Sequence, residues 1–109
     1  MKLTFRETPT FTNKMLELLS EDSYFELQDA LLACPDIGDL IQGGDGLRKL
    51  RWAAKGRGKR GGVRVIYYWQ VSRDRILFLD IYAKNEKTDL TKDELQQLVK
   101  IKCKEFGDE

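Results

Sequence analysis

The chain has 109 residues, with 19 lysines and arginines against 18 aspartates and glutamates, and no histidine. Its length leaves room for one hydrophobic core, so we expect a single domain over residues 1–109. No apolar run approaches the roughly 20 residues of a membrane span, and the first residues lack the apolar centre of a signal peptide. Two isolated cysteines without histidine predict neither a disulfide framework nor a zinc site. Composition therefore favours a cytoplasmic protein that needs no metal or cofactor.

The N-terminal part of the chain predicts one strand and two helices. Leu3 and Phe5 alternate with polar residues in a short strand over residues 2–7. Pro9 suits the first turn of a helix, whose apolar stripe continues to about residue 19. Ser23 and Glu26 have capping-box spacing at the start of a second helix, where the neighbouring acidic residues are also suitable. That helix ends before the proline at position 35.

The rest of the chain predicts three strands and a last helix. Residues 47–53 and 63–70 read as two strands, and the apolar run at 76–82 is typical of a strand covered on both faces. Thr91 and Glu94 form a capping box for a helix that ends at about residue 106. The order β-α-α-β-β-β-α predicts an α+β fold, in which a central antiparallel sheet carries its helices on one face.

The basic residues are unevenly distributed. No acidic residue stands between Asp45 and Asp74. Surfaces that are merely soluble mix both signs of charge, so this segment predicts a binding surface for the phosphates of RNA or DNA. An ordinary solvated face is the alternative. The bases in this interval are Arg48, Lys49, Arg51, Lys55, Arg57, Lys59, Arg60, Arg64 and Arg73.

The loop at residues 55–62 contains a G-x-G-x-x-G pattern at Gly56, Gly58 and Gly61. A dinucleotide site needs a strand before this pattern and a helix after it, whereas here a strand follows. A Walker phosphate loop also fails, because Lys59 is followed by arginine rather than serine or threonine. We interpret the glycines as allowing close approach to an RNA backbone.

Without histidine, acid–base chemistry must use lysine, tyrosine or a carboxylate. RNA supplies its own nucleophile, the 2′-OH, so an enzyme needs only a proton acceptor, a proton donor and charge stabilisation at phosphorus. Neighbouring cations disfavour the charged form of a lysine, which makes Lys49 or Lys55 a candidate base. Strand alternation places Lys49 and Arg51 on one face, and Arg64 is out of phase with the flanking valines.

Two segments carry a resemblance to a known family. GDLIQGGDGLRKLRWAAKGRGKRGGVRVIYYW and the later IYAKNEKTDLT are similar to the HigB branch of the RelE family of bacterial toxins. The resemblance implies a RelE-like fold and a metal-independent mRNA endoribonuclease that acts on the ribosome and inhibits translation. It also implies a cognate helix-turn-helix antitoxin, HigA-like, that either plugs the cleft or docks away from it. A non-catalytic RNA-binding module or degenerate toxin is the alternative.

The resemblance also implies roles for individual residues. Lys49, Arg51 and Arg64 match residues of the catalytic cleft, and Tyr82 and Lys84 match the Y-x-K-N-E segment. The tyrosine that many relatives carry in or near the last helix is missing, which leaves Tyr82 to stack on a base or donate a proton, or leaves the chemistry to lysine and arginine. The residues expected to bind RNA or the ribosome are Arg48, Lys55, Arg57, Lys59, Arg60 and Asn85.

Overall fold

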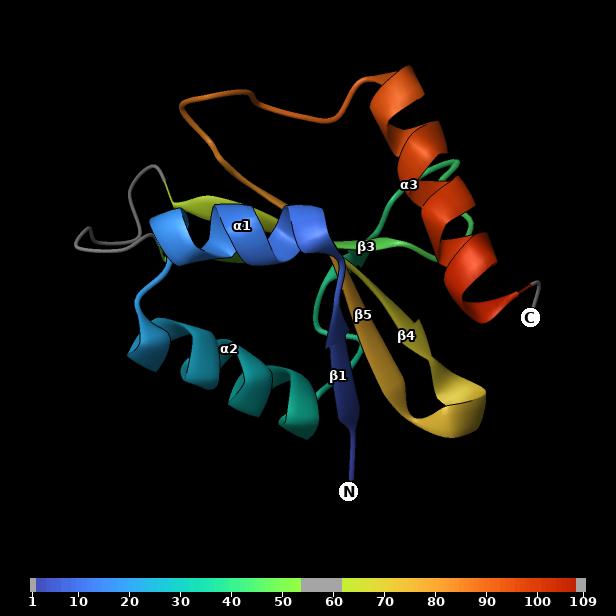
Figure 1. The fold of residues 1–109 in the computed structure, drawn as a ribbon, viewed down its shortest axis with the longest axis horizontal. Coiled ribbons are helices and arrows are strands. Elements are labelled where there is room, and N and C mark those ends of the chain that lie inside the picture. The colour runs from blue at the N-terminus through green and yellow to red at the C-terminus, as the bar shows by residue number, and fades with distance from the viewer. Residues whose placement is uncertain (1, 54–61, 108–109) are drawn as a thin grey trace.

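A computed structural model describes residues 2–53 and 62–107, and these segments form a five-stranded sheet with three helices (Figure 1). The expected α+β class is confirmed. No helix within these segments is long and apolar enough to cross a membrane. The elements are β1 (Thr4–Glu7), α1 (Pro9–Leu18), α2 (Glu21–Ala33), β2 (Asp39–Leu40), β3 (Arg48–Trp52), β4 (Val63–Gln70), the 3-10 turn η1 (Val71–Arg73), β5 (Arg75–Ala83) and α3 (Lys92–Phe106).

The strand order in the sheet is β1-β5-β4-β3-β2. Strands β3, β4 and β5 pair antiparallel in that order, as expected. The short strand β2, which was not predicted, pairs antiparallel with β3, and β1 pairs parallel with β5. The fully antiparallel sheet predicted from the element order is therefore wrong at one edge. The chain leaves β1 into α1 and α2 and returns to β5 only after the hairpin, and this long connection permits a parallel pair.

Helices cover both faces of the sheet, which corrects the prediction of helices on one face. The helices α1 and α2 pack on one face, where Phe11 and Leu27 contact a core that includes Val65. The helix α3 packs on the other face, where Leu95 joins a cluster that includes Ile66. Successive residues of β4 and β5 are apolar, so each face of the sheet needs its own cover.

A β-bulge interrupts the pairing of β4 with β5. Ile66 pairs with Asp80 and the next residue of β4 pairs with Phe78, so Leu79 is the extra residue. Because side chains alternate along a strand, the bulge changes which residues of β5 face α3. Phe78 faces α1 and α2, yet Tyr82, four residues later, packs in the α3 cluster. The bulge therefore turns Tyr82 to the α3 side of the sheet.

Local capping sets the start of each helix. The Thr8 side chain accepts a hydrogen bond from the Phe11 amide, and the predicted capping box at Thr91 and Glu94 is confirmed. The second helix begins earlier than the pair at Ser23 and Glu26 predicts. Its N-cap is Ser20, whose hydroxyl accepts from the Ser23 amide at 3.0 Å. Two acidic residues then occupy the first turn, where they complement the helix dipole.

Candidate active site

Three polar side chains form a row across the middle strands of the sheet, on the face that α3 covers. Arg51 of β3 pairs directly with Arg64 of β4, and Arg64 pairs with Tyr82 of β5. Side chains paired in this way lie on the same face, with Cβ atoms about 5 Å apart. The structure therefore brings three of the predicted catalytic residues together, although Arg51 and Tyr82 are 31 positions apart in the sequence.

The two arginines of this row have different environments. Arg51 is exposed, whereas Arg64 is only 9% exposed and its guanidinium donates a 3.3 Å hydrogen bond to the Val63 carbonyl. No ion pair joins either guanidinium to a carboxylate within residues 2–53 and 62–107. Both arginines line a cavity of about 480 Å³ together with Ser23, Glu26, Trp52 and Ala53. The cavity lies beside both guanidinium groups, and the Glu26 carboxylate of α2 also lines it.

Tyr82 is a buried phenol at the end of the row. Its side chain is 0% exposed, and its hydroxyl has no hydrogen-bond partner among the described residues. Burial raises the pKa of Tyr82 to about 12, the Asp89 carboxylate adds to this rise, and the positive charge of Arg64 opposes it. The phenol is therefore neutral at physiological pH and can donate a proton. Base stacking and proton donation, the two roles predicted for Tyr82, both require the buried ring or hydroxyl to become accessible.

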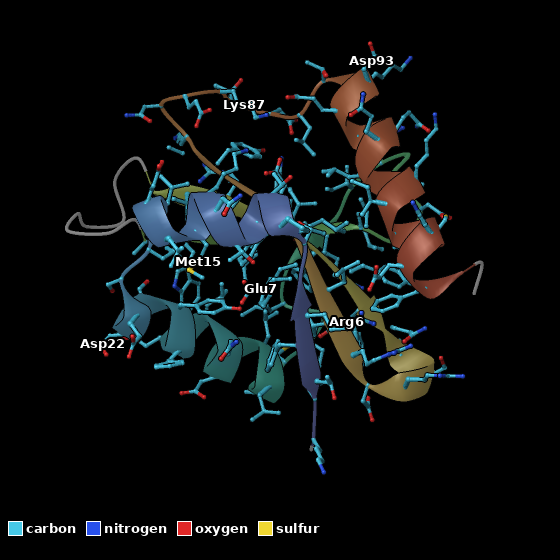
Figure 2. The ribbon with its side chains drawn as sticks, viewed as in Figure 1. Arg6, Glu7, Met15, Asp22, Lys87 and Asp93 are labelled. Atoms are coloured by element: carbon cyan, nitrogen blue, oxygen red, sulfur yellow. The ribbon has the colours of Figure 1, made fainter. Side chains whose placement is uncertain are left out.

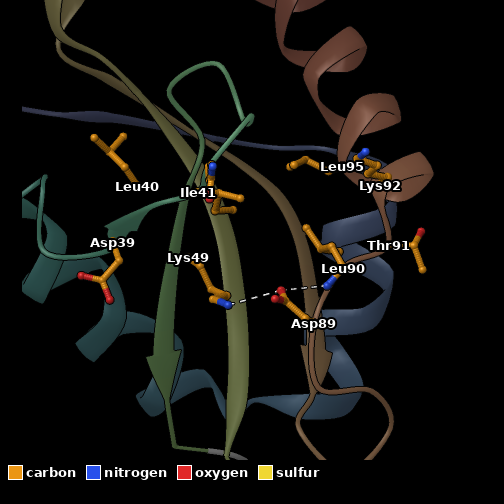
Figure 3. A pocket seen from close by; sticks show the side chains of 10 residues that line it. Asp39, Leu40, Ile41, Lys49, Asp89, Leu90, Thr91, Lys92 and Leu95 are labelled. Atoms are coloured by element: carbon orange, nitrogen blue, oxygen red, sulfur yellow. Dashed lines mark hydrogen bonds and ion pairs between the residues drawn. The ribbon is translucent and has the colours of Figure 1, made fainter.

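Lys49 lies two residues before Arg51 on the same face of β3. Its ammonium nitrogen is 3.3 Å from a carboxylate oxygen of Asp89 (Figure 3). The sequence predicts only cations around Lys49, but the fold brings a carboxylate from 40 positions away. A groove of about 430 Å³ adjoins this pair, lined by Asp39, Leu40, Ile41, Gln42, Lys49, Asp89, Leu90, Thr91, Lys92 and Leu95.

Comparison with known proteins decides the family. Residues 26–107 match the family described as the RelE toxin of the RelE/RelB toxin–antitoxin system. The chain belongs to the RelE toxin family. The structure is also similar to that of a free-state mutant of the E. coli toxin RelE, with a TM-score of 0.61 over 94% of this chain and 98% of that chain. Sequence identity is 11%, so this second likeness shows a shared fold.

The remaining predicted residues of this RelE-family toxin lie at several places. Lys84 and Asn85 are exposed just beyond β5, and the Lys84 amide donates to the Gly62 carbonyl, which extends the strand pairing past Tyr82. Arg48 lies on the opposite face from the row, and its guanidinium donates at 2.7 Å to the Gly38 carbonyl. It therefore braces a turn at the sheet edge. Lys55, Arg57, Lys59 and Arg60 lie outside the described residues.

Asp89 is the residue beside the row that sequence reasoning missed. It belongs to the segment between β5 and α3, where Lys87 also places its ammonium 4.9 Å from the centre of the Tyr82 ring. Both residues follow the Y-x-K-N-E segment closely, and that proximity is the one sequence signal that points to them. Across residues 2–53 and 62–107, no three carboxylate, thiol or imidazole side chains gather as a metal site.

Proposed function

We propose that this RelE-family toxin is a ribosome-dependent mRNA endoribonuclease of the HigB-like branch. In the proposed reaction the 2′-OH of the RNA attacks the adjacent phosphate, and no metal is needed. The observation that carries the proposal is the row of Arg51, Arg64 and Tyr82. Two guanidinium groups at adjacent strand positions can hold the non-bridging oxygens of one phosphate, and a neutral phenol lies next to them.

The proposed reaction assigns a task to each side chain. The 2′-OH loses its proton to one of two lysines, Lys49 or Lys84, and attacks the adjacent phosphorus. Arg51 and Arg64 stabilise the added negative charge on the phosphoryl oxygens, which is commonly the largest catalytic contribution. Tyr82 donates its proton to the departing 5′ oxygen, and the RNA is left with a 2′,3′-cyclic phosphate at one end and a 5′-OH at the other.

The shape of the site supports dependence on the ribosome. The cavity beside the arginines and the groove beside Lys49 are open to solvent, and neither encloses a scissile bond. Positioning of the reacting groups can supply several kcal/mol of an activation barrier. We infer that the ribosome supplies this positioning by holding the mRNA, and that the basic hairpin binds ribosomal RNA.

The helices α1 and α2 offer a surface of opposite charge for an antitoxin. Helix α2 contains no lysine or arginine, and Leu16 and Phe25 are 64% and 52% exposed. A basic amphipathic segment of a HigA-like antitoxin fits this combination of negative charge and exposed apolar side chains. We therefore favour docking on these helices over a segment that plugs the cleft. The exposed acidic residues of the surface are Glu17, Glu21, Asp22, Glu26 and Asp29.

Antitoxin affinity for matched variants distinguishes the two binding modes. Charge reversals at Glu17 and Asp22 should weaken binding, because they remove the complementary charge, whereas Arg51→Ala and Lys84→Ala should leave affinity intact. The measurement is titration calorimetry at two salt concentrations. The opposite pattern means that the antitoxin plugs the cleft.

A non-catalytic RNA-binding module is the second candidate, and the closed position of Tyr82 is the observation that favours it. Cleavage assays separate the two functions. Purified toxin should cut mRNA bound to ribosomes and cut free mRNA poorly, and its induced expression should stop growth unless the neighbouring antitoxin gene is expressed too. Binding of RNA without cleavage on ribosomes supports the second candidate, and equal cleavage of both substrates contradicts dependence on the ribosome.

A further inference from the structure

Residues 84–91 run from the end of β5 to Thr91, the N-cap of α3, and we call them the strap (Figures 1 and 2). Lys87 of the strap lies over the ring of Tyr82. Two ion pairs hold the strap. The Lys87 ammonium lies 2.7 Å from a carboxylate oxygen of Glu94 on α3, and Asp89 lies 3.3 Å from Lys49 on β3. The strap is therefore attached to the helix at one point and to the sheet at the other.

The closed strap leaves a polar group unsatisfied. Lys87 covers the Tyr82 ring, and the Tyr82 hydroxyl has no hydrogen-bond partner among the described residues. Buried polar groups of native proteins are nearly always hydrogen-bonded, so an exception calls for an explanation. A resting state that opens when a ligand arrives explains this exception, because opening exposes the hydroxyl to a new acceptor.

Asp89 makes a contact that an RNA phosphate would replace. Its carboxylate places one anionic oxygen next to the Lys49 ammonium, as a phosphate oxygen would be placed (Figure 3). The contact is suited to exchange, because Asp89 is 66% exposed and exposed ion pairs are weak. The same carboxylate oxygen also accepts from the Leu90 amide at 2.9 Å, so Asp89 keeps a partner when it leaves Lys49.

We propose that Asp89 occupies the phosphate position of Lys49 in the unbound toxin, and that RNA must displace the strap to reach Lys49 and Tyr82. The inference rests on the proposed function for the identity of the ligand. It goes beyond that function because it makes the Asp89 carboxylate a competitor of the RNA phosphate for Lys49. Lys87 then leaves the Tyr82 ring as the strap opens, and the phenol becomes available to the RNA.

The test is an affinity measurement that does not depend on cleavage. The probe is a short single-stranded RNA with 2′-O-methyl groups, which has no nucleophile. Asp89→Asn should bind it about two- to fivefold more tightly than wild type, in keeping with the strength of an exposed ion pair. Asp93→Asn is the matched control, because it removes the same charge from an exposed position in the first turn of α3, outside the groove (Figure 2).

A second comparison tests whether Asp89 acts through Lys49. In the Lys49→Met variant, the further change Asp89→Asn should alter probe affinity no more than Asp93→Asn does. The reason is that the contact between Lys49 and Asp89, for which phosphate would compete, is already absent. Hydrogen exchange of the amides at 85–91 should also become faster when the probe is bound to wild type. Both results support an exchange of Asp89 for phosphate.

Several outcomes overturn the inference. Equal affinities of Asp89→Asn and Asp93→Asn show that Asp89 does not compete with RNA, and weaker binding by Asp89→Asn shows that it contacts RNA directly. Absence of probe binding by every variant also overturns the inference. Cleavage of ribosome-bound mRNA by the wild-type toxin is measured separately. If the wild type cleaves this mRNA but Asp89→Asn and Asp93→Asn bind the probe equally, the proposed function stands and the displacement of the strap by RNA is refuted.

Discussion

Arg51 and Arg64 lie directly opposite each other in the β3–β4 ladder, so two like charges share one cross-strand position. Like charges at such positions destabilise a sheet. The arrangement becomes favourable when an anion binds between the two guanidinium groups, because each then gains a charge-assisted hydrogen bond. We therefore expect the sheet to be more stable with a phosphate bound than without one.

Arg64→Ala should lower the rate of cleavage on ribosomes by about a hundredfold or more, because the site loses a preorganised donor to the developing phosphoryl charge. The free energy of unfolding should change by under about 1 kcal/mol, since lost packing and relieved repulsion oppose each other. Arg73→Ala, which removes the same charge at the far end of β4, is the control. Full activity of Arg64→Ala removes this residue from the site, and gross unfolding makes its role structural.

Inorganic phosphate should raise the melting temperature of the wild-type toxin. At about ten times its dissociation constant, phosphate adds about 1.4 kcal/mol of stability. Arg51→Gln should lose most of this gain and should be slightly more stable than wild type in phosphate-free buffer, because the repulsion with Arg64 is gone. Thermal unfolding with and without phosphate measures both effects. An equal phosphate response in both proteins places the bound anion elsewhere.

Tyr82 should make the toxin sensitive to alkali. The pKa of Tyr82 is about 12 in the folded protein and about 10 in the unfolded chain, so the folded state holds this proton more tightly. The resulting stability is fully present below pH 10 and is lost as the pH rises from 10 to 12. Tyr82→Phe should therefore lose less stability across this interval. Urea unfolding at pH 8, 10 and 11 measures the free energy of unfolding of both proteins. An equal fall of this free energy with pH in the wild type and in Tyr82→Phe would contradict the prediction.

The same Tyr82→Phe substitution should leave stability at pH 7 unchanged or slightly higher, because it removes a buried hydroxyl that has no partner among the described residues. Cleavage on ribosomes should fall at the same time, since the proposed proton donor is lost. A variant that is stable and fully active shows that the proton comes from another group.

Asp80→Ala should destabilise the fold by about 1–3 kcal/mol. One carboxylate oxygen of Asp80 lies 2.8 Å from the Lys14 ammonium on α1 and accepts from the Ile81 amide at 2.9 Å. Lys14→Met should lower the free energy of unfolding by less, because Asp80 still accepts the hydrogen bond from the Ile81 amide. A double-mutant cycle in urea gives the coupling between the two side chains. Additive effects would mean that the ion pair contributes nothing to the free energy of unfolding.

Local patterns along the sequence predict much of this fold. The capping box at Thr91 marks the start of α3, and strand alternation places Lys49 and Arg51 on one face. Pairing between distant segments has no such local signal, so the parallel pair of β1 with β5 could not be read from periodicity. The continuous apolar run of β5 indicates a strand covered on both faces, whereas the order of the elements does not show on which face α3 packs.

The candidate site is less predictable, for two physical reasons. A bulge changes the phase of side chains along β5, so simple alternation from Phe78 places Tyr82 on the wrong face. Asp89 stands in a connecting segment without periodicity, and only the folded chain brings it to Lys49. The cations are predictable because they cluster in the sequence. Asp89, whose carboxylate pairs with Lys49, lies 40 positions away from that residue.

The position of β5 in the sheet has a consequence for synthesis. It is the last strand in the chain, yet it lies between β1 and β4 and pairs with both. Until it leaves the ribosome, β1 has no partner strand and the row of Arg51 and Arg64 lacks Tyr82. A nascent chain of this protein therefore cannot complete the row before residues 75–83 have left the ribosome, so the order of translation delays assembly of the candidate site.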